Sequence, residues 1–85
     1  MLPKYNWAYN KMNVLVFATS VQSDEQAKAL APHIDQLAGP GNWNFALDDC
    51  DKILRIVTST LQPKETILLL MQLGYHCEEL SDEIK

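Results

Sequence analysis

The sequence predicts an α+β fold in which a four-stranded antiparallel sheet carries two helices on one face. Short apolar segments with strand-like patterns alternate with two longer segments in which apolar residues recur every three or four positions. The chain has 85 residues, of which 47% are hydrophobic, so it can build one small core. We therefore expect one domain over residues 13–80, preceded by an aromatic segment at 1–12 and followed by a tail at 81–85.

Residues 13–19 predict the first strand. They form a run of branched and aromatic side chains that is short for a helix and apolar on both faces, as in a central strand. A helix is expected to begin after Ser23, because serine is a favourable N-cap and Gln26 occupies the capping-box position. Two acidic residues directly after Ser23 also suit the positive end of a helix dipole.

The first helix should bury a single apolar stripe. Its members follow the spacing of one helix face: Ala27, Leu30, Ala31, Ile34, Leu37 and Ala38. Pro32 removes a backbone donor, so it should kink this helix or divide it near Ala31. The Gly-Pro-Gly sequence at 39–41 ends the helix.

A hairpin and a second helix follow. Large residues alternate with small or polar ones over 43–47, residues 48–51 favour a turn, and 52–58 form another strand. Pro63 suits the first turn of a helix that stops at Gly74. Residues 75–80 form a short last strand with charge on its solvent side, and the tail is expected to fray.

The order strand, helix, strand, strand, helix, strand is typical of the ferredoxin-like arrangement. Right-handed crossovers then place both helices on one face of the antiparallel sheet and leave the other face open. Several segments also carry a family resemblance: residues 13–17, 27–30, 43–48, 53–56 and 70–75. Over about residues 12–80, the chain resembles the heavy-metal-associated (HMA) domain family of metallochaperones.

The resemblance implies the ferredoxin-like fold, but this chain lacks the residues of the family's metal site. The family's motif is a methionine, one residue, then two cysteines separated by two residues (CxxC). Counting back from Leu30 places Phe17 at the methionine, and Thr19 and Gln22 at the two cysteines. Neither can supply the thiolate that soft ions such as copper(I) or zinc require. We therefore expect a divergent relative without a metal or other cofactor.

The charge distribution narrows the classes of partner. Eleven acidic residues outnumber seven basic ones, the net charge is −4, and the chain has no basic block. Binding to a phosphate backbone needs a positive footprint, so we expect no nucleic-acid partner. The sequence has no apolar run of membrane-spanning length and no signal-peptide core, so we expect a cytoplasmic protein that does not associate with membranes.

The residues that could bind a metal ion or act in catalysis are better explained by structural roles. Asp48, Asp49, Cys50 and Asp51 could be a hard-cation site, but their spacing does not match a calcium loop, and a solvated turn is preferred. His76 and Cys77 are neighbours on a strand, so they point to opposite faces, and we expect one to be buried. Residual metal binding by Cys50, Cys77 or His76 stays open. Only His33 remains as a catalytic partner, so we expect no enzyme.

The sequence has more apolar residues in two places than one core can cover. If Val14 and Val16 face the helices, the open face of the sheet carries a patch of Leu15, Phe17, Ile53 and Val57. Either Tyr5, Trp7 and Tyr9 fold back over this patch, or it mediates self-association or binding of a protein partner. The second helix is also too broadly apolar to bury every leucine.

The resulting functional hypothesis is a non-enzymatic domain that acts by protein-protein interaction or self-association. Its contact surface would be the open sheet face or the flank of the second helix. The alternative is a metal-ion or small-ligand binding module related to metallochaperones, with its site in the loop at 19–23.

Overall fold

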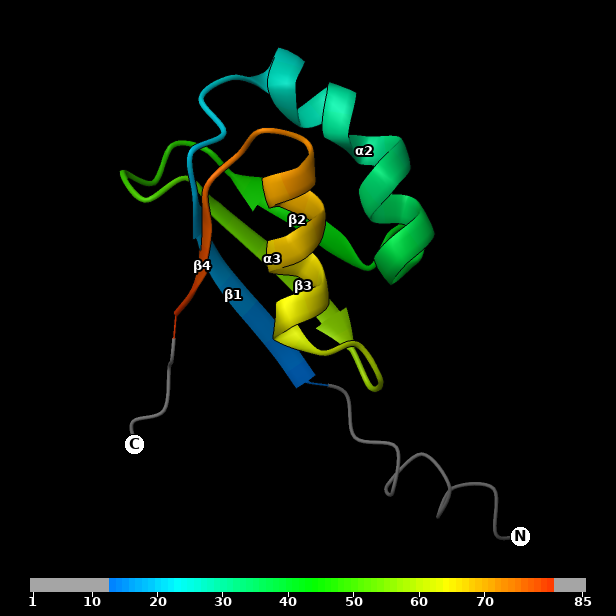
Figure 1. The fold of residues 1–85 in the computed structure, drawn as a ribbon. Coiled ribbons are helices and arrows are strands. Elements are labelled where there is room, and N and C mark those ends of the chain that lie inside the picture. The colour runs from blue at the N-terminus through cyan, green and yellow to red at the C-terminus, as the bar shows by residue number, and fades with distance from the viewer. Residues whose placement is uncertain (1–12, 81–85) are drawn as a thin grey trace, which may run out of the picture.

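The computed structural model describes residues 13–80, which form one α+β domain (Figure 1). The elements follow in the order β1 (Asn13–Thr19), α2 (Asp24–Ala38), β2 (Trp43–Ala46), β3 (Ile53–Thr58), α3 (Pro63–Gln72) and β4 (Cys77–Glu79). The predicted kinds of element and their order are confirmed. The last strand is shorter than the sequence indicated, and the turn between β2 and β3 is longer.

The four strands form one antiparallel sheet in the order β2-β3-β1-β4. This arrangement is compatible with a ferredoxin-like fold. The central strand β1 pairs with β3 along most of its length, but with β4 only from Phe17 to Thr19. Among the described strands, β2 and β4 are therefore the edges of the sheet.

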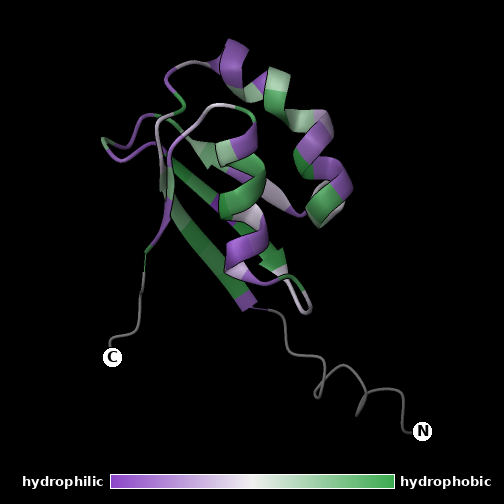
Figure 2. Cartoon of the chain, in the orientation of Figure 1, coloured by the Kyte–Doolittle hydropathy of each residue, from purple (hydrophilic) through white to green (hydrophobic). Residues whose placement is uncertain are grey.

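The core lies between one face of the sheet and the two helices. Its fully buried members are Phe17, Val21, Leu30, Ile34, Leu54, Ile56 and Leu70, with Cys77 nearly so. They come from β1, β3 and β4, from both helices, and from the loop before α2. Figure 2 shows that hydrophobic residues concentrate in the central strands β1 and β3. The helices thus cover the central strands on the same side of the sheet.

The predicted facing of β1 is wrong. Phe17 is 0% exposed and belongs to the core, and Leu15 packs against the core. Val14 is instead 52% exposed. The reason is the register with β3: Phe17 is opposite the buried Leu54, and opposed residues share a face. Tyr5, Trp7 and Tyr9 lie outside the described residues.

Pro32 does not divide the first helix. α2 runs without interruption from Asp24 to Ala38, although its axis turns along its length in Figure 1. Proline leaves the carbonyl one turn before it without its usual backbone donor. Both Pro32 and Lys28, which carries that carbonyl, are exposed, so water can take the place of the missing donor. Of the two outcomes expected at Pro32, a kink or a division of the helix, the division does not occur.

The N-terminus of α2 is capped as predicted. The Ser23 hydroxyl accepts a hydrogen bond from the Gln26 backbone N–H at 3.2 Å, and the Gln26 side chain accepts one from the Gln22 N–H at 2.7 Å. Ser23→Ala should therefore lower the free energy of unfolding by about 1 kcal/mol, because one helix donor loses its acceptor. Urea denaturation followed by circular dichroism measures this loss. Ser59→Ala, in the exposed loop after β3, is the matched control and should change stability much less. Equal effects would contradict the cap.

Candidate functional site

The loop at 19–23 is held together by its own polar groups. The Thr19 hydroxyl donates to the Lys52 carbonyl at 2.6 Å and accepts from the Val21 N–H at 3.2 Å. The Ser20 hydroxyl accepts from the His76 N–H at 2.9 Å, and the Ser20 N–H donates to the His76 carbonyl. Thr19 is buried and Gln22 is exposed, so these two positions differ in environment. Hydrogen bonds from this loop therefore connect the end of β1 to the hairpin and to the start of β4.

Among the described residues, His33, His76 and Cys77 are not part of any cluster of three potential metal ligands. Asp49, Cys50 and Asp51 lie close together in the hairpin turn and are all exposed, and the Asp49 carboxylate accepts from the Asp51 N–H at 2.9 Å. This is the local hydrogen bonding of a solvated turn. Cys77 is buried and His76 exposed, which confirms the expected division between them.

The open face of the sheet carries a modest apolar patch. Val14 and Val57 are opposed across β1 and β3 and are both exposed, and Val16 lies two residues along β1. Arg55 is opposite Val16 on the same face, and Asn44 is opposite Arg55 on β2. Of the patch predicted here, Val57 is exposed but Ile53 is buried. The polar side chains confine the patch to one end of the face.

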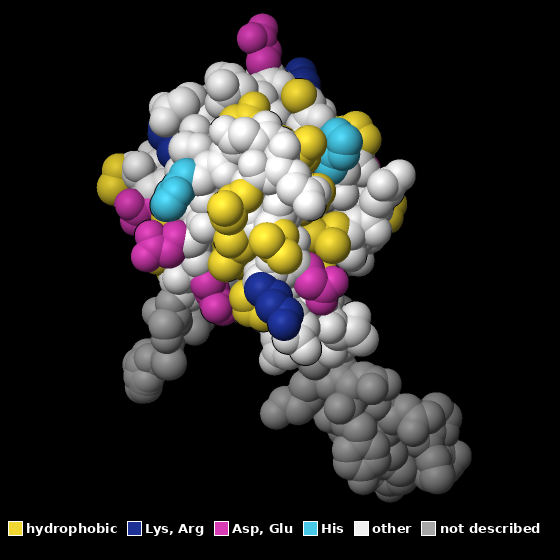
Figure 3. Space-filling view, in the orientation of Figure 1, with side chains coloured by type: hydrophobic (Ala, Val, Ile, Leu, Met, Phe, Trp, Pro, Cys, Tyr) yellow, Lys and Arg dark blue, Asp and Glu magenta, His cyan; other side chains and the backbone are white. Residues whose placement is uncertain are grey.

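The second helix exposes part of its apolar surface, as predicted. Leu68 and Met71 are 55% and 58% exposed and are three residues apart, so they are neighbours on one side of α3. Figure 3 shows hydrophobic side chains gathered on the side of the molecule where α3 lies in front of the sheet. This surface is a ridge rather than a hollow.

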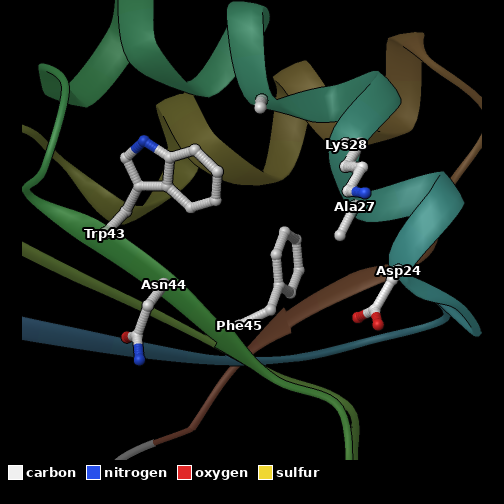
Figure 4. A pocket seen from close by; sticks show the side chains of 7 residues that line it. Asp24, Ala27, Lys28, Trp43, Asn44 and Phe45 are labelled. Atoms are coloured by element: carbon white, nitrogen blue, oxygen red, sulfur yellow. The ribbon is translucent and has the colours of Figure 1, made fainter.

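The described domain contains a groove between α2 and the edge strand β2 (Figure 4). We call it the α2–β2 groove. Its volume is about 300 Å³, and it is lined by Asp24, Ala27, Lys28, Ala31, Trp43, Asn44 and Phe45. Figure 4 shows the Trp43 and Phe45 rings rising from β2 toward the helix, with Asp24 and Lys28 on the α2 side. The volume lies at the lower end of the range for ligand pockets, so it fits one or two side chains better than a large cofactor.

The aromatic wall of this groove is held in place. The Trp43 indole N–H donates to the Asp35 carboxylate at 2.8 Å, which ties β2 to α2. The Trp43 and Phe45 rings meet edge to face, with centroids 5.9 Å apart. Both side chains are only half-buried. An aromatic surface that is fixed in position and partly exposed is suited to binding, because little conformational freedom is lost on contact.

The backbone beside the groove is suited to pairing with another strand. The Val57 N–H donates to the Asn42 carbonyl at 2.7 Å, so Asn42 directs its carbonyl toward β3. Because these directions alternate along an antiparallel strand, Asn44 and Ala46 also face β3, while Trp43 and Phe45 direct their N–H and C=O groups outward. Within residues 13–80 no strand pairs with that edge. An extended segment could therefore add to β2 with alternate side chains entering the groove.

Sequence reasoning identified the strand at 43–47 and the apolar stripe of the first helix, but not the groove between them. The available signal was a difference in size. Ala27 and Ala31 are small residues on the helix stripe, and they face Trp43 and Phe45. Small residues opposite half-exposed aromatic rings leave space.

No family model, curated protein or solved structure matches this chain. Within residues 13–80, neither helix has the length and apolar character needed to cross a bilayer.

Proposed function

We propose that this chain is a small non-enzymatic domain of the ferredoxin-like kind that acts by protein-protein interaction. Its binding site is the α2–β2 groove, and its ligand is an extended segment of a partner protein with large apolar side chains at alternate positions. The observation that carries this proposal is the coincidence of a sheet edge that no strand of residues 13–80 covers with an apolar groove beside it. Backbone hydrogen bonds to the edge would supply affinity, and the groove would supply specificity.

The proposed relationship to the HMA family is restricted to the fold. The alternative function, a metal-ion or small-ligand module at the loop 19–23, draws little support from that loop. The Thr19 hydroxyl is already engaged as donor and acceptor, and it stands where the family has its first cysteine. A ligand there would have to displace bonds that tie the loop to the hairpin.

Peptide selection against the full chain tests the binding site. Peptides chosen from a displayed library of random seven-residue segments should carry aromatic or large aliphatic residues at alternate positions. Ala31→Arg, which fills the groove, should weaken their binding by about tenfold or more, as expected when an interaction of more than about 1.4 kcal/mol is lost. Fluorescence anisotropy of labelled peptides measures the dissociation constants.

Ala29→Arg is the matched control, because it makes the same change on an exposed side of the same helix. It should bind the selected peptides as the wild type does. Circular dichroism checks that both variants remain folded. Peptides that bind Ala31→Arg as tightly as wild type would place the binding site elsewhere, with the open sheet face and the ridge of Leu68 and Met71 as the next surfaces to test.

A further inference from the structure

We propose that the partner of the α2–β2 groove is a second copy of this chain, whose β2 pairs with β2 of the first copy about a twofold axis at Asn44. This inference rests on the proposed function, because it names the partner that the groove binds. Three features of the described residues support it: the side-chain pattern of β2, the direction of its backbone groups, and the charges beside the groove.

β2 has the side-chain pattern that the groove requires of its ligand. Trp43 and Phe45 are large and apolar, and they alternate with Asn44 and Ala46. In Figure 4 both rings rise on the side of α2, whereas the Asn44 side chain points away from the helix. Both rings are half-buried, so each keeps apolar surface for another contact. Every copy of the chain therefore carries an extended segment of the required kind at the edge of its sheet.

The outward backbone groups of β2 restrict the register of such a pair. Trp43 and Phe45 direct their N–H and C=O groups away from β3. In an antiparallel pair, residues of this kind must be opposite each other. The register centred on Asn44 meets this condition with both residues inside β2, because Trp43 of each copy is then opposite Phe45 of the other. Asn44 meets its own equivalent on the axis, with the two Cα atoms about 4.5 Å apart.

This register also joins the aromatic rings of the two copies. Opposed residues share a face of the sheet, so Trp43 of each copy lies beside Phe45 of the other on the helix side. Within one copy these two rings already meet edge to face, with centroids 5.9 Å apart. Cross-strand aromatic pairs stabilise antiparallel sheets, and the contact covers surface that a single copy exposes. Each groove is thus closed by rings that the other copy supplies.

The charges beside the groove are compatible with a second copy. β2 has no charged side chain, so the two strands bring no like charges together, although the chain has a net charge of −4. On α2, Asp24 and Lys28 are one turn apart and both line the groove. The twofold axis reverses the direction of α2 in the second copy, so Lys28 of each copy can reach Asp24 of the other. Such reciprocal pairs favour one register over others.

Sedimentation equilibrium of the full chain over a range of concentrations tests for the dimer. The strand has four residues and makes a small interface, so we expect dimers that dissociate in the micromolar range. Asn44→Lys places two ammonium groups opposite each other at the axis and should weaken the dimer by about fivefold or more. Asn13→Lys, the matched control, makes the same change at an exposed position of β1 and should dimerise as the wild type does.

A mixture of two variants tests the register itself. When Asn44→Lys is mixed with Asn44→Asp, opposite charges meet at the axis, so mixed dimers should form about fivefold or more tightly than dimers of Asn44→Lys alone. A fluorescent label on one variant identifies the mixed dimers during sedimentation. Circular dichroism checks that both variants are folded. If the folded variants do not recover dimerisation when mixed, the pairing at Asn44 is wrong.

Binding of selected peptides separates this inference from the proposed function. The Asn44 side chain points away from α2, so Asn44→Lys should bind the peptides at least as tightly as the wild type. A chain that stays monomeric while it binds peptides, or a dimer that Asn44→Lys leaves unchanged, would overturn the pairing and leave the groove as a binding site. Variants that pair when mixed but select no peptides would support the pairing and overturn only the recognition of segments from other proteins.

Discussion

Phe17→Ala should lower the free energy of unfolding by about 3–5 kcal/mol, which is comparable with the total stability of many small domains. Phe17 is fully buried on the helix side of β1, opposite Leu54, so the substitution leaves a cavity beneath both helices. Urea denaturation measured by circular dichroism gives the loss. If the alanine variant is unfolded without urea, Phe17→Leu, which removes less volume, should give an intermediate and measurable loss.

Val14→Ala is the matched control on the same strand. Its side chain is half-exposed on the open face, so the expected loss is less than about 1 kcal/mol, which is the span of strand propensities. The opposite ranking, with Val14 costing more than Phe17, would show that β1 presents its other face to the helices.

High pH should destabilise the domain through Cys77. Burial raises the pKa of the Cys77 thiol from 9.0 to about 12. The unfolded chain loses this proton near pH 9, whereas the folded chain keeps it until near pH 12. The contribution is therefore fully present below pH 9 and is lost as the pH rises through this window, by about 1.4 kcal/mol for each pH unit. Urea midpoints measured at intervals between pH 8 and about pH 11 give the slope.

The two cysteines provide the comparison that isolates this effect. Cys77→Ala removes the buried thiol, so its stability should decline more gradually with pH, even though its stability near neutral pH is already lower. Cys50→Ala removes the exposed thiol of the hairpin turn and should retain the steeper decline. Parallel slopes for wild type and Cys77→Ala would contradict the assignment.

The order of elements could be predicted from the sequence, because each element carries its own local signal. Ser23 and Gln26 define the start of α2, Gly39 marks its end, and Pro63 marks the start of α3. The facing of β1 could not be predicted in the same way. Its side chains are apolar at successive positions, so the strand has no polar face, and only its pairing with Leu54 decides that Phe17 is buried.

The groove depends on distances between elements rather than on any motif. Trp43 and Phe45 give a strong strand signal, and Ala27 a strong helix signal, but neither signal states how closely α2 approaches β2. The separation is set partly by the Trp43–Asp35 hydrogen bond, which joins residues eight positions apart. Such a contact between side chains produces no periodic pattern in the sequence from which it could be predicted. The loop at Thr19 is similar, since its partner carbonyl on Lys52 is 33 residues away.

The two edges of the sheet are unequal, which limits how identical copies of the described domain can assemble by joining sheets. β4 is three residues long and carries Glu78 and Glu79, whereas β2 has no charged side chain. Charge and shortness discourage pairing at an edge. Pairing is therefore favoured at β2 over β4, and two copies joined there about a twofold axis pair the outward backbone groups of both β2 strands. Growth through the β2 edge therefore stops at two copies, because a twofold pair leaves no β2 edge uncovered.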